Sequence, residues 1–174
     1  KVVYLRGNHE QALLISLQEN GVEFLSGQWL RWGGGACLAS YGVAPADTPE
    51  LFQENFLEKL PTSHLHFYEK SALMYDTDKY LFVHAGVRPG VPLSEQRGRD
   101  LMFIRSPFIP YEGKTDLPIH DVVGDKTVVF GHTIMHNGVY DDDQRLGIDT
   151  GAYMSGKLTA AVLKNDGEKS FIQT

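Results

Sequence analysis

The sequence contains a single cysteine, Cys37, among its 174 residues. One cysteine excludes an intramolecular disulfide and any zinc site built from several thiolates, and such sparing use is typical of the reducing cytoplasm. A free cysteine usually packs as a small hydrophobic side chain, which is our interpretation of Cys37. We therefore expect a cytoplasmic protein without a structural disulfide.

Long apolar runs and an excess of basic residues are also missing. No segment approaches the ~20 apolar residues that cross a bilayer, and no signal-peptide pattern opens the chain, so no membrane partner is expected. The 16 Lys and Arg residues are outnumbered by 22 Asp and Glu, which gives a formal net charge of -6. An acidic chain lacks the basic face of nucleic-acid-binding proteins, so we expect no nucleic-acid partner. Local basic pockets for phosphate are compatible with this balance.

The chain does contain short runs of β-branched and aromatic residues that predict buried strands. A composition of 42% hydrophobic and 22% charged residues fits one globular domain with a sizeable core. The expected strands are residues 2–5, 80–83 and 127–130, followed by 145–153 and 157–164 as a hairpin with glycine turns. Strands mixed with helices predict an α/β layered domain.

Helical spacing of apolar residues alternates with these strands. It predicts a helix that starts after Asn8 and stops near Gly21, and another over 49–60 with Thr48 as its N-cap. Residues 64–76 are expected to form a helix and then a strand. The glycine-rich stretch 27–42 is expected to be irregular or a hairpin.

Three predicted strands end in side chains that can bind a metal ion. Asn8 and His9 follow the first, His84 ends the second, and His132 follows the third. Because ligands of open α/β sheets bind outside the carboxyl ends of the strands, these side chains sit where chemistry is usually done. Imidazole and amide oxygen suit zinc, manganese or iron, whereas calcium or magnesium would favour more carboxylates. The neighbouring glycines, Gly7, Gly86 and Gly131, would let the backbone approach an ion closely.

A lone histidine at a strand end is more often a hydrogen-bonded structural residue than a ligand. The joint occurrence of three such strand ends favours the metal interpretation. The other histidines follow no such rule, and we interpret them as surface or packing residues: His64, His66, His120 and His136.

The same residues lie in motifs that resemble a known family. "LRGNHE", "FVHAG" and "FGHT", in this order, resemble the later signature blocks of the calcineurin-like metallophosphoesterases, and Glu10 resembles the PPP branch of serine/threonine phosphatases. "HAGVRPG", "LMFIRSPF" and "IDTGAYMSGKLTA" are similar to bacterial PPP-type phosphatases and the related diadenosine tetraphosphatases. The resemblance covers nearly the whole chain, and the three short blocks together are specific.

The resemblance implies a two-sheet α/β sandwich with α/β/β/α layers and two divalent metal ions at the carboxyl edge of its sheets. It implies that Asn8, His84 and His132 ligate one ion, and that His9 donates a proton to the leaving group. Manganese is the expected metal, with iron or zinc as alternatives. Attack on phosphorus by a metal-bound hydroxide would require no covalent intermediate.

Arginine is the natural clamp for phosphate because its planar fork bonds two oxygens at once. Arg105, in "FIRSPF", matches the family's later phosphate-binding arginine, and Arg88 is a second, weaker candidate. We interpret Arg6 as a partner of nearby carboxylates. Asp149 and Thr150 are interpreted as turn-forming residues, and the acidic run 141–143 as a solvated hairpin tip.

The chain departs from the family pattern at one point. The family's two earlier blocks, Gly-Asp-x-His-Gly and Gly-Asp-x-x-Asp-Arg-Gly, carry the second metal's ligands, and neither occurs in these residues. We therefore interpret residues 1–174 as the C-terminal major part of a single metallophosphoesterase domain that lacks its N-terminal strands. These residues hold the ligands of one metal only, and alone we expect them to be inactive.

Three functions are compatible with this pattern. The leading hypothesis is a phosphatase acting on phosphoserine or phosphothreonine in proteins, or on small phosphoesters. The first alternative is a symmetrical bis(5'-nucleosyl)-tetraphosphatase, for which Trp29 and Trp32 would be base-stacking candidates, although core packing is favoured for both. The second alternative is a non-catalytic binding module with a degenerate metal site, which gives no chemical reason for His9 and Arg105.

Overall fold

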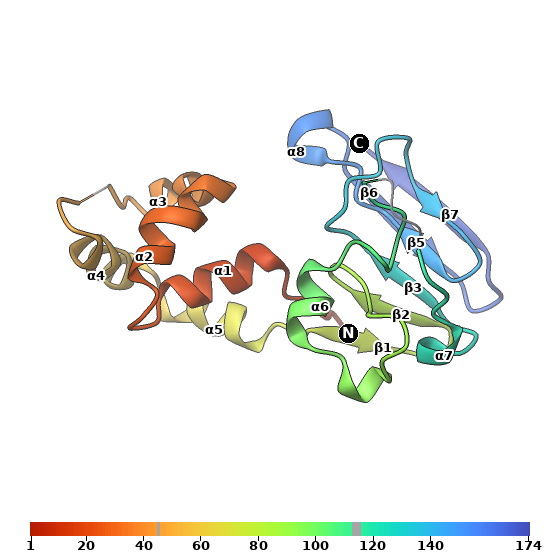
Figure 1. Cartoon of the computed structure of the whole chain (residues 1–174). Coiled ribbons are helices and arrows are strands. Elements are labelled where there is room, and N and C mark those ends of the chain that lie inside the picture. The colour runs from red at the N-terminus through yellow and green to blue at the C-terminus, as the bar shows by residue number, and fades with distance from the viewer. Residues whose placement is uncertain (45, 113–115) are drawn as a thin grey trace. The chain divides into compact units, whose positions relative to one another are not determined.

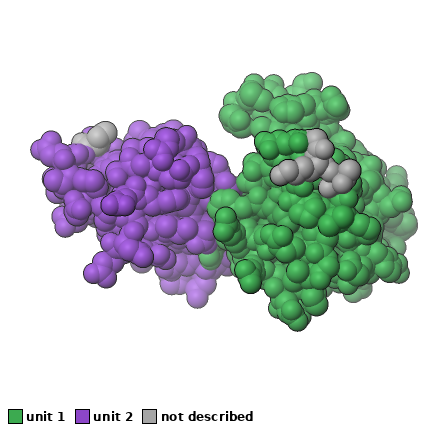
Figure 2. Space-filling view, viewed as in Figure 1, with its two compact units in different colours: residues 1–7, 72–174 green, residues 8–71 purple. Residues whose placement is uncertain are grey.

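The computed structural model describes residues 1–44, 46–112 and 116–174. The chain divides into two compact units, of which unit 1 comprises residues 1–7 and 72–174 and unit 2 comprises residues 8–71 (Figure 2). Unit 1 contains all the named strands, and unit 2 is helical. The predicted mixture of helices and strands is confirmed.

A five-stranded mixed sheet with the order β1-β2-β3-β5-β4 forms the centre of unit 1 (Figure 1). Strands β2, β3 and β5 are parallel to one another, while β1 and β4 pair antiparallel at the two edges. The carboxyl ends of the three parallel strands therefore share one edge of the sheet. The strands are β1 (Met74–Asp76), β2 (Tyr80–Val83), β3 (Thr127–Phe130), β4 (Tyr140–Asp141) and β5 (Arg145–Gly147).

The apolar runs of the parallel strands are buried as their composition predicts. Leu81 and Val128 are completely buried, and they pack in one cluster with Phe108 and Phe130. Three short helical segments contribute side chains that lie in or against this cluster: η2 (Leu93–Glu95), α6 (Gly98–Phe103) and α7 (His120–Val123). Packing also explains Gly86, because a Cβ on it would lie 2.2 Å from Cδ1 of Phe108.

A second, two-stranded sheet contains β6 (Thr159–Leu163) and β7 (Lys169–Gln173), which pair antiparallel. Ala161 and Leu163 of β6 pack against Tyr80, Val129 and Leu146 of the larger sheet. The predicted hairpin between residues 145–153 and 157–164 is wrong. Helix α8 (Ala152–Ser155) separates β5 from β6, and β6 takes its partner from the end of the chain instead.

The predicted buried strand at residues 2–5 is also wrong. Among the described residues, this segment forms one isolated parallel bridge, between Leu5 and Ala72. Val2 and Tyr4 are 72% and 56% exposed. The bridge is not extended into a ladder among the described residues, and the chain after Ala72 continues into β1, which pairs with β2.

Unit 2 is built from helices around its own apolar cluster. Phe56, Leu25 and Leu38 are its most deeply buried large side chains, and the rings of Trp29 and Phe56 stack with centroids 5.7 Å apart. Thr48 caps the helix after it, because its Oγ1 accepts a hydrogen bond of 3.2 Å from the Leu51 N–H. The helices are α1 (Asn8–Ser16), α2 (Val22–Phe24), η1 (Leu25–Gly34), α3 (Gly35–Ser40), α4 (Pro49–Lys59) and α5 (Thr62–Lys70). None of the helices in the described residues is both long enough and apolar enough to span a membrane.

The stretch 27–42 is helical, so its prediction as irregular or hairpin backbone is wrong. It lies in η1, a π-helix, and in α3, with a kink at Gly33, whose φ is 92°. A Cβ on Gly34 would come within 2.6 Å of the Trp29 ring. The glycines therefore allow the buried tryptophan to pack closely, and this tertiary packing overrides their low helix propensity.

Candidate functional site

Two of the predicted metal ligands meet at the carboxyl edge of the larger sheet. His84 directly follows β2, and His132 comes two residues after β3. Their half-buried rings lie with centroids 5.2 Å apart and planes inclined by 55°. The His84 carbonyl oxygen accepts a hydrogen bond of 2.8 Å from the Gly131 N–H, which ties the two strand ends together. The sequence motifs thus correctly identify two histidines that lie side by side.

The backbone at His132 is unusual for a residue with a side chain. Its φ is 65°, and the Thr133 N–H donates a hydrogen bond of 2.7 Å to the Gly131 carbonyl oxygen. A hydrogen bond between residues two apart defines a γ-turn, and the form with positive φ is rare and strained. Strain of this kind persists only where the surrounding structure enforces it, and it clusters at functional sites.

The two histidines line a cavity of about 350 Å³ formed by the ends of the three parallel strands. Asp149, which follows β5, also lines it, as does Leu5. Asp149 forms the turn that was predicted, since its Oδ1 accepts a hydrogen bond of 2.9 Å from the Gly151 N–H. Thr150 is similarly engaged, with its Oγ1 2.8 Å from the Thr159 hydroxyl.

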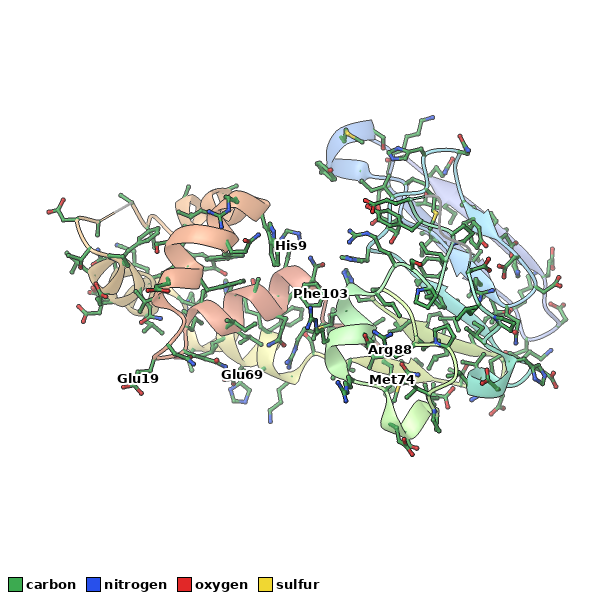
Figure 3. The ribbon with its side chains drawn as sticks, viewed as in Figure 1. His9, Glu19, Glu69, Met74, Arg88 and Phe103 are labelled. Atoms are coloured by element: carbon green, nitrogen blue, oxygen red, sulfur yellow. The ribbon has the colours of Figure 1, made fainter. Side chains whose placement is uncertain are left out.

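The other two predicted site residues belong to unit 2. Asn8 is the first residue of α1 and comes three positions after Leu5, which lines the cavity of unit 1. His9 is exposed at the amino end of α1, and its ring lies 6.4 Å from that of Trp32 (Figure 3). The roles of Asn8 as a metal ligand and of His9 as a proton donor stay predictions.

The donor set at the sheet edge fits a first-row divalent ion, because imidazole binds zinc, manganese and iron. In the described parts of the chain, no group of three or more His, Cys, Asp or Glu side chains is arranged to hold a metal. Asp149 is therefore not placed as a third ligand beside His84 and His132. The predicted ligands are two histidines and the amide of Asn8, and an amide does not count toward such a group. The absence of such a group therefore does not test the predicted ligand set.

A second and larger cavity of unit 1 carries a cluster of arginines. It measures about 780 Å³, and we call it the arginine cavity. Guanidinium groups outnumber carboxylates on its walls, although the chain as a whole carries a formal charge of -6. The charged residues that line it are Arg88, Arg97, Arg99, Arg105, Glu95 and Asp100.

Arg105, the first candidate for phosphate binding, is half-buried in this cavity. Its guanidinium lies 5.2 Å from the centroid of the Tyr111 ring. Its buried Nε makes no hydrogen bond with any described residue. Because buried donors almost always find an acceptor, this N–H group is suited to an anionic ligand.

Arg88 is bound to a neighbouring carboxylate. Its Nε donates to Oδ2 of Asp100 at 2.9 Å and its Nη2 donates to Oδ1 at 2.5 Å. This bidentate pair holds the pKa of Asp100 below its usual range, with further lowering by Arg97 and Arg99, and it raises the pKa of Arg88. Two N–H groups of Arg88 are thereby used to hold α6 against the loop after β2. A phosphate-binding role for Arg88 stays a prediction.

Phe103 joins the two cavities. It lies at the end of α6 (Figure 3) and lines the arginine cavity. Its ring meets the His132 ring edge-on, with centroids 6.3 Å apart. Sequence reasoning missed this residue, because one aromatic in an apolar run carries no signal. It also missed Arg97 and Arg99, although the arginine-dense text "QRGRD" in an acidic chain was a usable signal.

The remaining histidines lie where surface or packing residues are expected. The Tyr41 hydroxyl lies 2.9 Å from Nδ1 of His64, and His120 pairs with Asp125 at 3.3 Å. His66 and His136 are exposed.

Comparison of the chain with family models, with curated proteins and with solved structures found no match. The histidine pair and the adjoining arginine cavity are therefore the observations from which a function is argued.

Proposed function

We propose that this protein is a metal-dependent phosphoester hydrolase with the two-sheet metallophosphoesterase fold, acting on phosphoserine or phosphothreonine in proteins or on small phosphomonoesters. One observation carries the proposal: His132 packs against Phe103, which also lines a cavity that contains four arginines. Phosphoester hydrolysis needs metal ligands next to cationic groups that bind phosphoryl oxygens. The His132–Phe103 contact supports the proposal because it joins one histidine of the pair to a cavity lined by such cationic groups.

His84, His132 and Asn8 would hold one divalent ion, with manganese favoured and iron or zinc as alternatives. The ligands of the second ion in the resembled family belong to two sequence blocks that these 174 residues do not contain. Divalent ions, when bound, neutralise phosphoryl charge and lower the pKa of a water molecule.

Two side chains of this chain would then serve the reaction directly. Arg105 binds phosphoryl oxygens through its guanidinium, whose buried Nε makes no hydrogen bond within the described residues. His9 gives a proton from its imidazolium to the oxygen of the leaving group, as a general acid. The strained turn at His132 keeps the imidazole at the sheet edge, next to His84.

The tetraphosphatase alternative needs aromatic faces for two nucleobases. Trp29 is 2% exposed and stacks on Phe56, while Trp32 packs edge-on against Phe24 at 5.9 Å. Trp29 therefore offers no bare face to a base, whereas Trp32 is 37% exposed, so one of the two candidates is accessible to a nucleobase. The burial of Trp29 favours a phosphatase. A binding module without turnover explains the cavities but gives no role to His9.

The test is a side-by-side assay of the full-length protein, loaded with Mn²⁺, on a phosphopeptide, para-nitrophenyl phosphate and diadenosine tetraphosphate. We expect the protein to hydrolyse the phosphopeptide and para-nitrophenyl phosphate. The His84→Ala variant should lose both this hydrolysis and its bound manganese. The matched control, His66→Ala, changes an exposed histidine of α5 and should retain both. Hydrolysis of the dinucleotide alone would favour the tetraphosphatase, and binding without turnover of any substrate would favour the module.

A further inference from the structure

We propose that the arginine cavity is a second anion subsite, which selects phosphopeptides with an acidic side chain or a second phosphate near the phosphorylated residue. This inference rests on the proposed function, in which Arg105 binds the phosphoryl group that is removed. Arg97 and Arg99 would bind the additional anion.

Charge is the first argument. Arg97 and Arg99 are exposed on the wall that contains the Arg88–Asp100 ion pair, and neither guanidinium group makes a hydrogen bond or ion pair with the described residues. Glu95 is the remaining carboxylate of the lining. Both arginines are close enough to Asp100 to lower its pKa further. The wall therefore presents an excess of positive charge to an incoming anion.

A preformed wall is the second argument. The side chain of Gln96 donates to the Arg88 carbonyl oxygen at 2.9 Å and to the Val91 carbonyl oxygen at 2.7 Å. The Arg88 N–H donates back to Oε1 of Gln96 at 2.8 Å, and the Arg88–Asp100 pair joins this loop to α6. Because these hydrogen bonds already fix the loop, it loses less conformational entropy when a ligand binds.

Spacing is the third argument. Arg99 and Phe103 lie in α6, four residues apart, which is about 6 Å along a helix axis. Phe103 contacts His132, so this spacing measures how far Arg99 lies along α6 from the ring beside the histidine pair. An extended peptide advances about 3.3 Å per residue and covers a similar length in about two residues. Ligand pockets measure roughly 300–1,000 Å³. The arginine cavity, at about 780 Å³, is large enough for such a peptide segment.

The aromatic groups of the cavity argue against a nucleotide as occupant. Phe103 is the aromatic residue of the described lining, and its ring packs against His132. The nearby Tyr111 ring is covered by the Arg105 guanidinium. A nucleobase would find a single aromatic side chain, Phe103, in the described lining, whereas a peptide carboxylate or phosphate needs only the guanidinium groups.

The test compares two phosphopeptides that differ only at the second and third residues after phosphoserine, glutamate in one and glutamine in the other. The full-length, Mn²⁺-loaded protein is assayed by fluorescence anisotropy for binding and by phosphate release for kcat/KM. In Arg97→Gln/Arg99→Gln we expect about tenfold weaker binding of the glutamate peptide, a steeply salt-dependent loss, and a change of less than about twofold for the glutamine peptide. The control Lys59→Gln/Lys70→Gln removes the same charge from exposed positions of unit 2 and should change neither peptide.

A charge-reversed variant makes the test independent of folding defects. Arg97→Glu/Arg99→Glu should bind a peptide with lysine at the same two positions better than the glutamate peptide, a gain that misfolding does not produce. Equal losses for both original peptides, or no loss, would overturn the subsite. A loss confined to diadenosine tetraphosphate would assign the cavity to a nucleotide and also overturn it. Selective binding without phosphate release would overturn the proposed function but support the subsite.

Discussion

His132 combines a strained backbone with a predicted role in metal binding. Its φ of 65° suits glycine better than histidine. In metal-free protein, His132→Gly should therefore raise the free energy of unfolding by about 0.5–1 kcal/mol, because without metal the relief of backbone strain is not offset by the loss of a stabilising ligand. After Mn²⁺ loading, the variant should bind less manganese than the wild type. Urea denaturation with chelator and metal analysis after loading measure the two effects separately.

The control for this prediction is His84→Ala, because His84 has no such strain. It should lose manganese without a gain in stability. A His132→Gly variant that is less stable than the wild type would show that the histidine itself stabilises the turn, contrary to this account.

His9 and His84 should separate proton transfer from metal binding. His9→Asn removes the proposed general acid and should lower kcat for the proposed hydrolysis by about 10²–10⁴-fold with little loss of manganese. His84→Ala should remove manganese first, and activity with it. Metal analysis beside steady-state kinetics checks this, and the reverse pattern would refute both roles.

At the scale of single elements, α6 depends on one buried carboxylate. Asp100 is 8% exposed and accepts two hydrogen bonds from Arg88. Asp100→Asn should lower the free energy of unfolding by about 1–3 kcal/mol at pH 7, because it breaks a charge-assisted pair. Urea denaturation measures the loss, and an unchanged midpoint would contradict it.

The same pair predicts a pH dependence. The folded state holds the pKa of Asp100 below its usual value of 3.8, so the pair's stabilising contribution is complete above about pH 4. It is lost as the pH falls through the lowered pKa. The difference in stability between wild type and Asp100→Asn should therefore shrink from pH 7 to about pH 2.5. A constant difference would show that Asp100 stabilises α6 by packing alone.

Elements were predictable from sequence where local signals and burial agree. Continuous apolar runs identified β2 and β3, and Thr48 with Pro49 identified the start of α4. The prediction for residues 27–42 was wrong because glycines usually indicate loops. Here they lie in a helix, where the missing side chain of Gly34 leaves room for the buried Trp29 ring. The strand predicted for residues 2–5 was wrong because an apolar run forms a strand only where a partner strand exists.

The candidate site was predictable in part for a related reason. His84 and His132 stand at strand ends, where topology alone brings them to one edge of the sheet. Arg97 and Arg99 are exposed, and the spacing of surface charges in a sequence does not predict that they line a cavity. Their significance depends on the ion pair of Arg88 with Asp100, which no spacing in the sequence reveals.

At the scale of the whole molecule, the chain contains two compact units with separate apolar clusters. Phe56 is fully buried in the cluster of unit 2. Phe56→Ala should destabilise that unit by about 3–5 kcal/mol. Amide hydrogen exchange should then become faster in α1 and α4 while β2 and β3 keep their protection. Equal acceleration in both units would show that they unfold as one.

The central claim is that Asn8, His84 and His132 hold a common metal ion. Anomalous diffraction from crystals of the full-length protein grown with Mn²⁺ tests it most directly. The account predicts a manganese peak about 2.0–2.3 Å from one ring nitrogen of each histidine and from the Asn8 amide oxygen. A peak that touches neither histidine, or no peak at this edge of the sheet at saturating Mn²⁺, would contradict it.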